Sequence, residues 1–305
     1  MDSAAVRFFP VKGLTKRLEY LAVRLVIGGI NRTPISAASW IARAIGGLLY
    51  LAAPHRRRTA IANLTIAYGD TLSLPEKQKL ARESFQNFAT SLAEFFRISQ
   101  LLRGAEQRFV FEGTEHLDRA FQKNHGVILV ISHLGSWECL SFLPYLRGYP
   151  CSVVVREVRN PYLYRWIQRL RLVTRLNPID RKDSVREVLS ELKKNHLVAI
   201  LIDQWAGHDG VWVDFFGKPT STTSIPARLA RKTGASLIPA YCLRTGCGRY
   251  KIRVLPAAPL DSDPDEQEKK TTLLLNRILE AEILKYPEQW IWGHERWKGR
   301  ERHVV

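Results

Sequence analysis

A histidine and a glutamate stand five residues apart where an apolar run gives way to a polar turn. The run covers residues 127–131, and His133 and Glu138 follow it in the segment GVILVISHLGSWE. A neutral imidazole can remove a proton from a hydroxyl group, and a carboxylate on its other ring nitrogen fixes the tautomer. The pair is therefore a candidate general base, His133, with an orienting partner, Glu138. The bland alternative is a buried histidine beside a glutamate at a helix start.

The elements around this pair are predicted to hold it at the edge of a sheet. Continuous Val, Ile and Leu over 127–131 suits a parallel strand that is covered on both faces. His133 then falls at the carboxyl end of the strand, where open α/β sheets bind ligands. Ser136 is predicted to cap a helix that has Glu138 in its first turn.

Two more polar clusters follow predicted strands. Arg156 comes after the apolar residues 153–155, and Asp203 and Gln204 come after Ile202. An arginine fork can hold a phosphate, and a second carboxylate could position a substrate hydroxyl. We expect these side chains at the same edge as His133, although charged residues at strand ends are usually solvated.

The segment DFFGKPTSTTSIPAR at 214–228 supplies Lys218, Thr223 and other donors before a helix that begins near Pro226. Such a loop ahead of a helix N-terminus suits phosphate or another anion. An ordinary capped turn fits the same residues equally well.

Short apolar runs alternate with helical patterns through most of the chain, which predicts an α/β fold with a mixed, largely parallel sheet flanked by helices. The predicted strands are 109–112, 127–131, 152–155, 197–202, 237–241 and 251–255, and the clearest helices are 75–98 and 271–285, with a charged loop at 261–270.

Composition limits the partners. Forty-six Lys and Arg against 29 Asp and Glu give a net charge of +17, which favours an anionic lipid surface, a phosphorylated substrate, an acidic carrier protein or nucleic acid. Nucleic acid is disfavoured because the basic residues are spread along the chain and no helix-turn-helix or RNP-like pattern occurs. The four cysteines form no CxxC pair, and no HExxH, Walker or dinucleotide motif is present, so no metal or cofactor is expected.

The first 58 residues differ from the rest and are predicted to be a membrane-associated helical segment, with a catalytic domain over 59–305. Residues 35–53 are largely apolar and are interrupted by Arg43. A short membrane span and an interfacial helix both fit, and a buried core helix is the third possibility. Three arginines at 56–58 place the following chain in the cytoplasm by the positive-inside rule.

Together these segments resemble the lysophospholipid acyltransferase superfamily and, within it, the bacterial lipid A biosynthesis acyltransferases that add lauroyl or myristoyl chains. The resemblance begins with the amino-terminal segment, Asn63-Leu64 and the helix that ends near Glu94. Its later blocks are HLGSWE at 133–138, VVVREVRNP at 153–161, DQ at 203–204, DFFGKPTSTTSIPARLA at 214–230 and PEQWIWGHERWK at 287–298.

The resemblance implies an O-acyltransferase at the cytoplasmic face of the inner membrane. It would move an acyl chain from acyl carrier protein to a hydroxyl of a lipid A precursor or a similar anionic glycolipid. His133 and Glu138 match the family's H-x4-D/E motif, Arg156 a substrate-binding arginine and Asp203 an acidic position near the site. His294 and Arg296 fall in its carboxyl-terminal block.

The expected mechanism is direct attack, with donors near the turn at His133 stabilising the oxyanion. A covalent route through Ser136 or Cys139 is the alternative, although the G-x-S-x-G elbow is absent. Another lipid acceptor, or a lipid-surface thioesterase that uses the same dyad on water, remains open. So does acyl-CoA as the donor.

Overall fold

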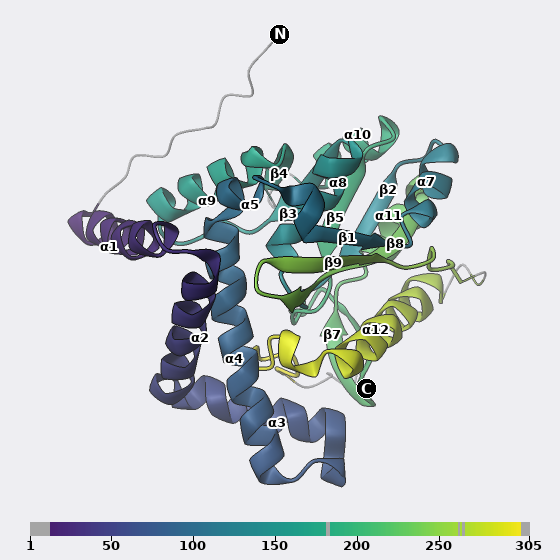
Figure 1. The fold of residues 1–305 in the computed structure, drawn as a ribbon. Coiled ribbons are helices and arrows are strands. Elements are labelled where there is room, and N and C mark those ends of the chain that lie inside the picture. Colours follow the sequence, from purple (N-terminus) through teal and green to yellow (C-terminus); the bar gives the residue numbers. More distant parts are fainter. Residues whose placement is uncertain (1–12, 181–183, 262, 264–265, 300–305) are drawn as a thin grey trace.

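A computed structural model describes residues 13–180, 184–261, 263 and 266–299 of the chain (Figure 1). Residues 1–12 of the expected membrane segment, 262 and 264–265 of the expected charged loop, and 300–305 of the expected catalytic domain lie outside the described residues. The expected boundary at residue 58 falls inside one continuous helix, α3 (Pro54–Tyr68).

A seven-stranded sheet forms the centre, in the order β1-β9-β8-β2-β5-β3-β4. Its strands are β1 (Phe109–Glu112), β2 (Val127–Ile131), β3 (Cys151–Val155), β4 (Leu176–Asp180), β5 (Leu197–Leu201), β8 (Ser236–Gly246) and β9 (Arg249–Val254). Strands β8, β2, β5, β3 and β4 are parallel, and β9 pairs antiparallel to β8. The prediction of a mixed, largely parallel sheet is confirmed.

Side chains of the central strands alternate between two cores, because successive residues of a strand point to opposite faces. In β2, Ile128 and Val130 join one core, whereas Val127, Leu129 and Ile131 join the other. Both faces are covered, which explains the uninterrupted apolar sequence.

Helices flank the sheet on both sides (Figure 1). One core is closed by α10 (Ser184–Lys193), α11 (Ile225–Thr233) and α12 (Gln267–Lys285), and the other by α5 (Ile98–Leu101), α7 (Glu115–Gln122), α8 (Phe142–Arg147) and α9 (Pro161–Val173). The remaining short helices are α6 (Ala105–Arg108), η1 (Gly69–Thr71), η2 (Trp137–Ser141) and η3 (Pro287–Gln289).

Several local expectations differ from the structure. Strand β4 was missed, and so was the hairpin of β6 (Val211–Phe215) and β7 (Lys218–Thr222), which replaces the expected loop. Helix α12 begins at Gln267, inside the expected charged loop. Ser136 does not cap the next helix, since its hydroxyl donates to Glu94.

The amino-terminal helices are α1 (Leu14–Asn31), α2 (Ile35–Ala52) and α3, and α2 lies along α4 (Leu74–Phe96). Among the described residues, α2 is the one helix long and apolar enough to cross a membrane. Its small residues face α4: a Cβ on Gly46 would lie 2.5 Å from the Gln86 Cα. Backbones this close mean that one face of α2 is packed on protein.

The other faces of α1 and α2 expose apolar side chains. More than half of the exposed large apolar residues of the described chain lie on these two helices: Leu14, Leu18, Leu21, Leu25 and Val26 on α1, and Trp40, Leu48, Leu49 and Leu51 on α2. An exposed apolar patch of this kind is typical of a membrane or protein interface.

Candidate active site

Three parallel strands bring the predicted polar residues to one edge of the sheet. Ile131 at the end of β2 pairs with Leu201 at the end of β5, so His133 and Asp203 emerge side by side. Strand β3 lies on the other side of β5 and delivers Arg156 to the same edge.

His133 and Asp203 form a hydrogen-bonded pair. The His133 Nδ1 lies 2.9 Å from Asp203 Oδ1, and the His133 backbone N–H donates to Oδ2 at 2.8 Å. The indole of Trp290 also donates to Oδ2, at 3.0 Å. The Asp203 side chain is fully buried, whereas His133 keeps 15% of its side chain exposed. Donation from Nδ1 to Asp203 leaves Nε2 as the basic nitrogen.

The pair shifts both titrations in the direction that a general base requires. Burial disfavours the charged imidazolium, but the charge and hydrogen bond of Asp203 outweigh burial and raise the pKa of His133. Burial likewise opposes the Asp203 carboxylate, yet His133 and the three hydrogen bonds hold the pKa of Asp203 well below its usual value. Asp203 is therefore an anion able to stabilise an imidazolium.

Glu138 does not hold the place predicted for it. Its carboxylate binds Arg171 of α9 through two bonds, Nη2 to Oε1 at 2.5 Å and Nε to Oε2 at 3.1 Å. The physical reason is that Glu138 sits in the short helix η2, whose course carries it toward α9, while the adjacent strand β5 places Asp203 against the imidazole. Glu138 remains close enough to favour the imidazolium electrostatically.

A cavity of about 570 Å³ opens beside this pair. Its polar lining consists of His133, Glu138, Ser141, Arg156, Arg171, Gln204, Asp209, Thr223, Ser224 and Arg228, and its apolar lining includes Leu129, Ile131, Leu140, Val153, Val155, Leu176, Ala199 and Leu201. The Gln204 amide nitrogen lies 3.5 Å from His133 Nε2, on the reactive side of the ring. The cavity thus joins a basic, polar mouth to an apolar wall made by the sheet.

The structure does not bring Lys218, His294 or Arg296 into the lining of this cavity. Lys218 is exposed at the start of β7. Burial lowers the pKa of His294 to about 4, so its imidazole is neutral near pH 7 and offers no charge to an anion. None of the three lines this cavity, although His294 lies close enough to His133 and Asp203 to interact electrostatically with both.

Arg296 is buried within the protein and supports the loop after β5. It donates to the Ser221 carbonyl at 2.8 Å, to Thr222 Oγ1 at 2.6 Å and to the Gln204 carbonyl at 3.4 Å. Its guanidinium also lies 5.0 Å from the ring centre of Phe215. These contacts hold the backbone of Gln204 rather than a substrate.

Backbone donors at the turn are already engaged. The N–H groups of His133, Gly135 and Ser136 donate to Asp203, to the Gln289 carbonyl and to the Cys242 carbonyl. The expectation that donors near this turn stabilise an oxyanion therefore does not hold for these three groups. The side chains of Gln204, Arg156 and Arg171 line the cavity and have donors to offer.

Neither nucleophile considered from the sequence faces the cavity. Ser136 Oγ donates to Glu94, and Cys139 is fully buried, with burial raising the pKa of its thiol well above normal. Cys151 does line the cavity, but burial raises the pKa of its thiol to about 12. Thiolates are the reactive form of cysteine, so neither Cys139 nor Cys151 is activated as a nucleophile. Across the described residues, no group of three or more His, Cys, Asp or Glu could hold a metal ion.

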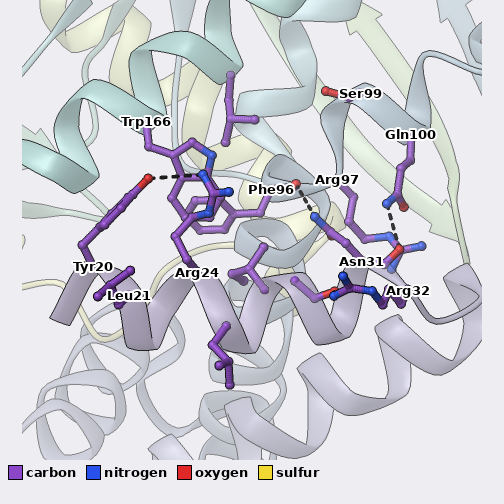
Figure 2. Close-up of a pocket in the computed structure, with 14 residues that line it drawn as sticks. Tyr20, Leu21, Arg24, Asn31, Arg32, Phe96, Arg97, Ser99, Gln100 and Trp166 are labelled. Atoms are coloured by element: carbon purple, nitrogen blue, oxygen red, sulfur yellow. Dashed lines mark hydrogen bonds between the residues drawn. The ribbon is translucent and has the colours of Figure 1, made fainter. Parts of the chain in front are cut away.

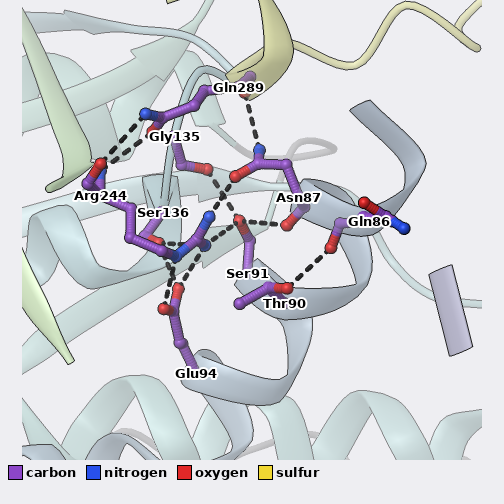
Figure 3. A network of polar contacts seen from close by, with 9 residues as sticks. All are labelled: Gln86, Asn87, Thr90, Ser91, Glu94, Gly135, Ser136, Arg244 and Gln289. Atoms are coloured by element: carbon purple, nitrogen blue, oxygen red, sulfur yellow. Dashed lines mark hydrogen bonds and ion pairs between the residues drawn. The ribbon is translucent and has the colours of Figure 1, made fainter. Parts of the chain in front are cut away.

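Behind the turn lies a buried polar network (Figure 3). Arg244 of β8 binds Glu94 of α4 at 2.6 and 2.7 Å and donates to Ser136 Oγ at 2.8 Å. Ser91 donates to the Gly135 carbonyl at 2.9 Å. Gln289 and Arg244 exchange two further bonds at 2.9 and 3.1 Å. The hydrogen bonds of this network therefore fix the positions of both the turn after His133 and the segment that precedes Trp290.

Sequence reasoning missed four residues of this site: Arg171, Trp290, Glu94 and Arg244. Arg171 lies in a basic helix that was not predicted, and Trp290 lies in a tryptophan-rich block that packing alone would explain. Glu94 and Arg244 are 150 residues apart, and no local pattern links them.

Comparison with known proteins gives matches over most of the chain. A model of the family described as bacterial lipid A biosynthesis acyltransferase matches residues 13–299. The chain is 30% identical over 224 residues to a phosphatidylinositol mannoside acyltransferase of Mycolicibacterium smegmatis, covering 72% of each chain. It is 29% identical over 260 residues to the lipid A biosynthesis lauroyltransferase of Escherichia coli (82% of each) and 27% identical over 257 residues to that organism's palmitoleoyltransferase (80% of each).

Proposed function

The chain belongs to the bacterial lipid A biosynthesis acyltransferase family and is an acyltransferase, and on that premise we propose that it moves a fatty acyl chain from acyl carrier protein to a hydroxyl of a lipid A precursor. The observation that carries this assignment is the His133–Asp203 pair at the mouth of an apolar cavity. An acyl chain matches the apolar wall, and the base lies where the chain meets the polar mouth.

We assign His133 as the general base and Asp203 as its orienting carboxylate. His133 Nε2 takes the proton of the acceptor hydroxyl while that oxygen attacks the thioester carbonyl carbon. The carbon–sulfur bond then breaks, and the departing thiolate takes the proton from the imidazolium. Asp203 stabilises the imidazolium between these two steps.

Glu138 and Arg171 are assigned to substrate binding together with Arg156, Gln204 and Thr223. All five line the cavity mouth. The arginines suit a phosphate of the acceptor or of the carrier's prosthetic group, because guanidinium forks bind phosphate oxygens in pairs. Gln204 is the uncharged donor nearest the base.

The net charge of +17 supports an acidic carrier protein as donor and an anionic glycolipid as acceptor. Arg228 extends the basic mouth from the first turn of α11. Acyl-CoA shares the phosphates but not the acidic protein surface, so a comparison of the two donors at rising salt separates them.

A second acceptor class has its own support. A relative at 30% identity is named for phosphatidylinositol mannoside rather than lipid A. Both acceptors present sugar hydroxyls beside an anionic lipid anchor, and the cavity mouth offers arginines to either.

We further propose that the chain works at the cytoplasmic face of the inner membrane, with residues 1–58 contributing the membrane contact and 59–305 the catalysis. The exposed apolar faces of α1 and α2 support this seating. Because the small-residue face of α2 is packed on α4, an interfacial position suits α2 better than a lone span.

The test is an acyl-transfer assay on membranes that contain the full-length protein. Labelled acyl carrier thioester is supplied with a lipid A precursor, with a phosphatidylinositol mannoside, or with no acceptor. We expect acceptor-dependent product that falls about 10²- to 10⁴-fold in His133→Ala. His125→Ala, which alters an exposed histidine outside the cavity, is the matched control. Full activity of His133→Ala would refute the assignment, and release of free fatty acid without acceptor would instead identify a thioesterase.

A further inference from the structure

A second cavity, of about 620 Å³, lies between α1, the junction of α4 with α5, and α9 (Figure 2). Its charged lining residues are all basic: Arg24, Arg32 and Arg97. Within the described residues that line it, none is an aspartate or a glutamate. The cavity is therefore positively charged by its own walls.

Arg97 gives this cavity a buried positive charge. It is only 7% exposed, and it donates to the backbone carbonyls of Ile30 and Thr33. Its Nε has no hydrogen-bond partner among the described residues, and the side-chain bonds that it does make there both go to carbonyl oxygens. A buried cation that is paired only with carbonyls gains stability when an anion binds beside it.

Aromatic rings and a second guanidinium complete the inner wall. The Arg24 guanidinium lies 5.0 Å from the ring centre of Trp166, and Trp166 stacks on Phe96 at 4.6 Å. Tyr20 closes the side and accepts from Arg24 at 3.2 Å. Aromatic residues with a polar edge beside arginines are typical of the headgroup level of a membrane.

The outer wall is apolar and continues past the cavity. Leu21 and Leu25 line it and are 58% and 79% exposed. With Leu14 and Leu18 they recur at helical spacing along α1 and form a stripe, which we call the α1 leucine stripe. A free phosphate would use the arginines but would leave the stripe in water.

We propose that this cavity binds the headgroup of an anionic phospholipid of the bilayer, with its hydrocarbon lying along the α1 leucine stripe. Basic and apolar walls that meet along one helix fit the two ends of such a lipid. The inference rests on the proposed membrane association and is independent of the proposed chemistry at His133.

The test measures the affinity of the full chain for two kinds of vesicle. One is phosphatidylcholine alone, and in the other a quarter of the lipid is phosphatidylglycerol. The cavity variant is Arg24→Glu with Arg32→Glu, since both side chains are exposed and their loss spares the core. The matched control is Arg119→Glu with Arg186→Glu, two exposed arginines on α7 and α10 that give the same change in net charge.

We expect the wild type to prefer phosphatidylglycerol vesicles and the cavity variant to lose at least about tenfold in affinity for them, since each basic residue near an anionic surface contributes. The control should lose clearly less. Equal losses in the two variants would overturn the proposed site and show that the overall charge sets the binding. An unchanged preference in the cavity variant would also overturn the proposed site.

Two more arms complete the design. Leu21→Ser with Leu25→Ser should weaken binding to both kinds of vesicle. Unchanged binding would show that the lipid hydrocarbon does not lie along the α1 leucine stripe. Inorganic phosphate alone should not raise the wild-type melting temperature. If it did so in a manner that needs Arg24 and Arg32, while vesicle preference was absent, the site would be one for a free anion. Wild type that binds neither vesicle yet transfers acyl chains would refute the membrane seating without touching the chemistry.

Discussion

The sheet edge that carries His133 and the outer faces of α1 and α2 differ in what they expose to solvent. Behind the turn after His133, charged groups are withdrawn from solvent and paired, as in the bond between Glu94 and Arg244. Along α1 and α2, apolar side chains such as Leu25 and Trp40 are left in solvent.

This difference separates a site that is organised in advance from a surface that awaits a partner. Fixed dipoles and charges around a base need no rearrangement during reaction, which is the main electrostatic contribution to catalysis. Exposed leucines are unfavourable in water and become favourable when lipid covers them. The polar groups around His133 are in place once the chain has folded, whereas the apolar faces of α1 and α2 would be covered only by a bound partner.

The largest expected effect comes from neutralising, one at a time, the two carboxylates near His133. Asp203→Asn should lower kcat about 10²- to 10⁴-fold, because the amide no longer stabilises the imidazolium. Glu138→Gln removes the pair with Arg171 and should act mainly on KM. Steady-state kinetics with saturating acceptor checks both. A larger kcat loss for Glu138→Gln than for Asp203→Asn would return the orienting role to Glu138.

The buried network can be tested against a second buried ion pair. Glu94→Gln leaves Arg244 without its anion and should cost about 3–5 kcal/mol of unfolding free energy. It should also lower kcat, since Ser136 loses a partner. Glu282→Gln breaks the Arg253 pair at 2.6 Å, away from the site, and should cost similar stability with kcat unchanged.

Denaturant unfolding and kinetics on the same preparations give both readings. If Glu94→Gln does not fold, Ser91→Ala removes a single bond to the Gly135 carbonyl and keeps the question open to measurement. If Glu94→Gln and Glu282→Gln both kept the kcat of the wild type, the network would only stabilise the fold.

Substitutions on the exposed apolar surface should change membrane binding and leave the stability of the fold almost unchanged. Leu18→Ser with Leu48→Ser should weaken partition into vesicles, since burying one leucine contributes about 1.5–3 kcal/mol. Unfolding free energy should stay within about 0.5 kcal/mol, because both side chains are exposed. Flotation and denaturant unfolding measure the two quantities. A large loss of stability would show that these leucines pack on protein.

The mildest probe is pH. Because Asp203 raises the pKa of His133 above its ordinary 6.5, the base becomes protonated, and kcat/KM falls, at a higher pH than an isolated histidine would give. In Asp203→Asn the pKa of His133 should fall, so the acid limb of the residual activity should shift to a lower pH. A profile of kcat/KM from acid to neutral pH tests the direction, and an unmoved limb would assign the titration to another group.

Much of the fold could be predicted because its signals are local. The apolar run before His133 could only be buried, and the strand there has the predicted bounds, Val127–Ile131. Strand β4, with Asn177 and Pro178, lacks such a run because it lies at the sheet edge. The hairpin of β6 and β7 was hidden by its threonines, which read as a loop.

The partners within the site could be predicted only in part. His133 and Asp203 were both placed at one edge, but which carboxylate meets the imidazole depends on the direction of a short 3-10 helix after Ser136. Sequence distance favoured Glu138, whereas the pairing of β2 with β5 favoured Asp203. Which parallel strands lie side by side is set by the tertiary structure and cannot be predicted from the spacing of residues along the chain.

The bond from Trp290 to Asp203 has a consequence for protein synthesis. His133 and Asp203 leave the ribosome long before residue 290, so in the nascent chain the Asp203 carboxylate lacks the hydrogen bond from Trp290. Asn63 likewise waits for its acceptor carbonyls at Trp292 and His294. Helix α1 is translated first among the described elements and can reach a bilayer early. Arrival at the membrane would then precede the onset of activity during translation.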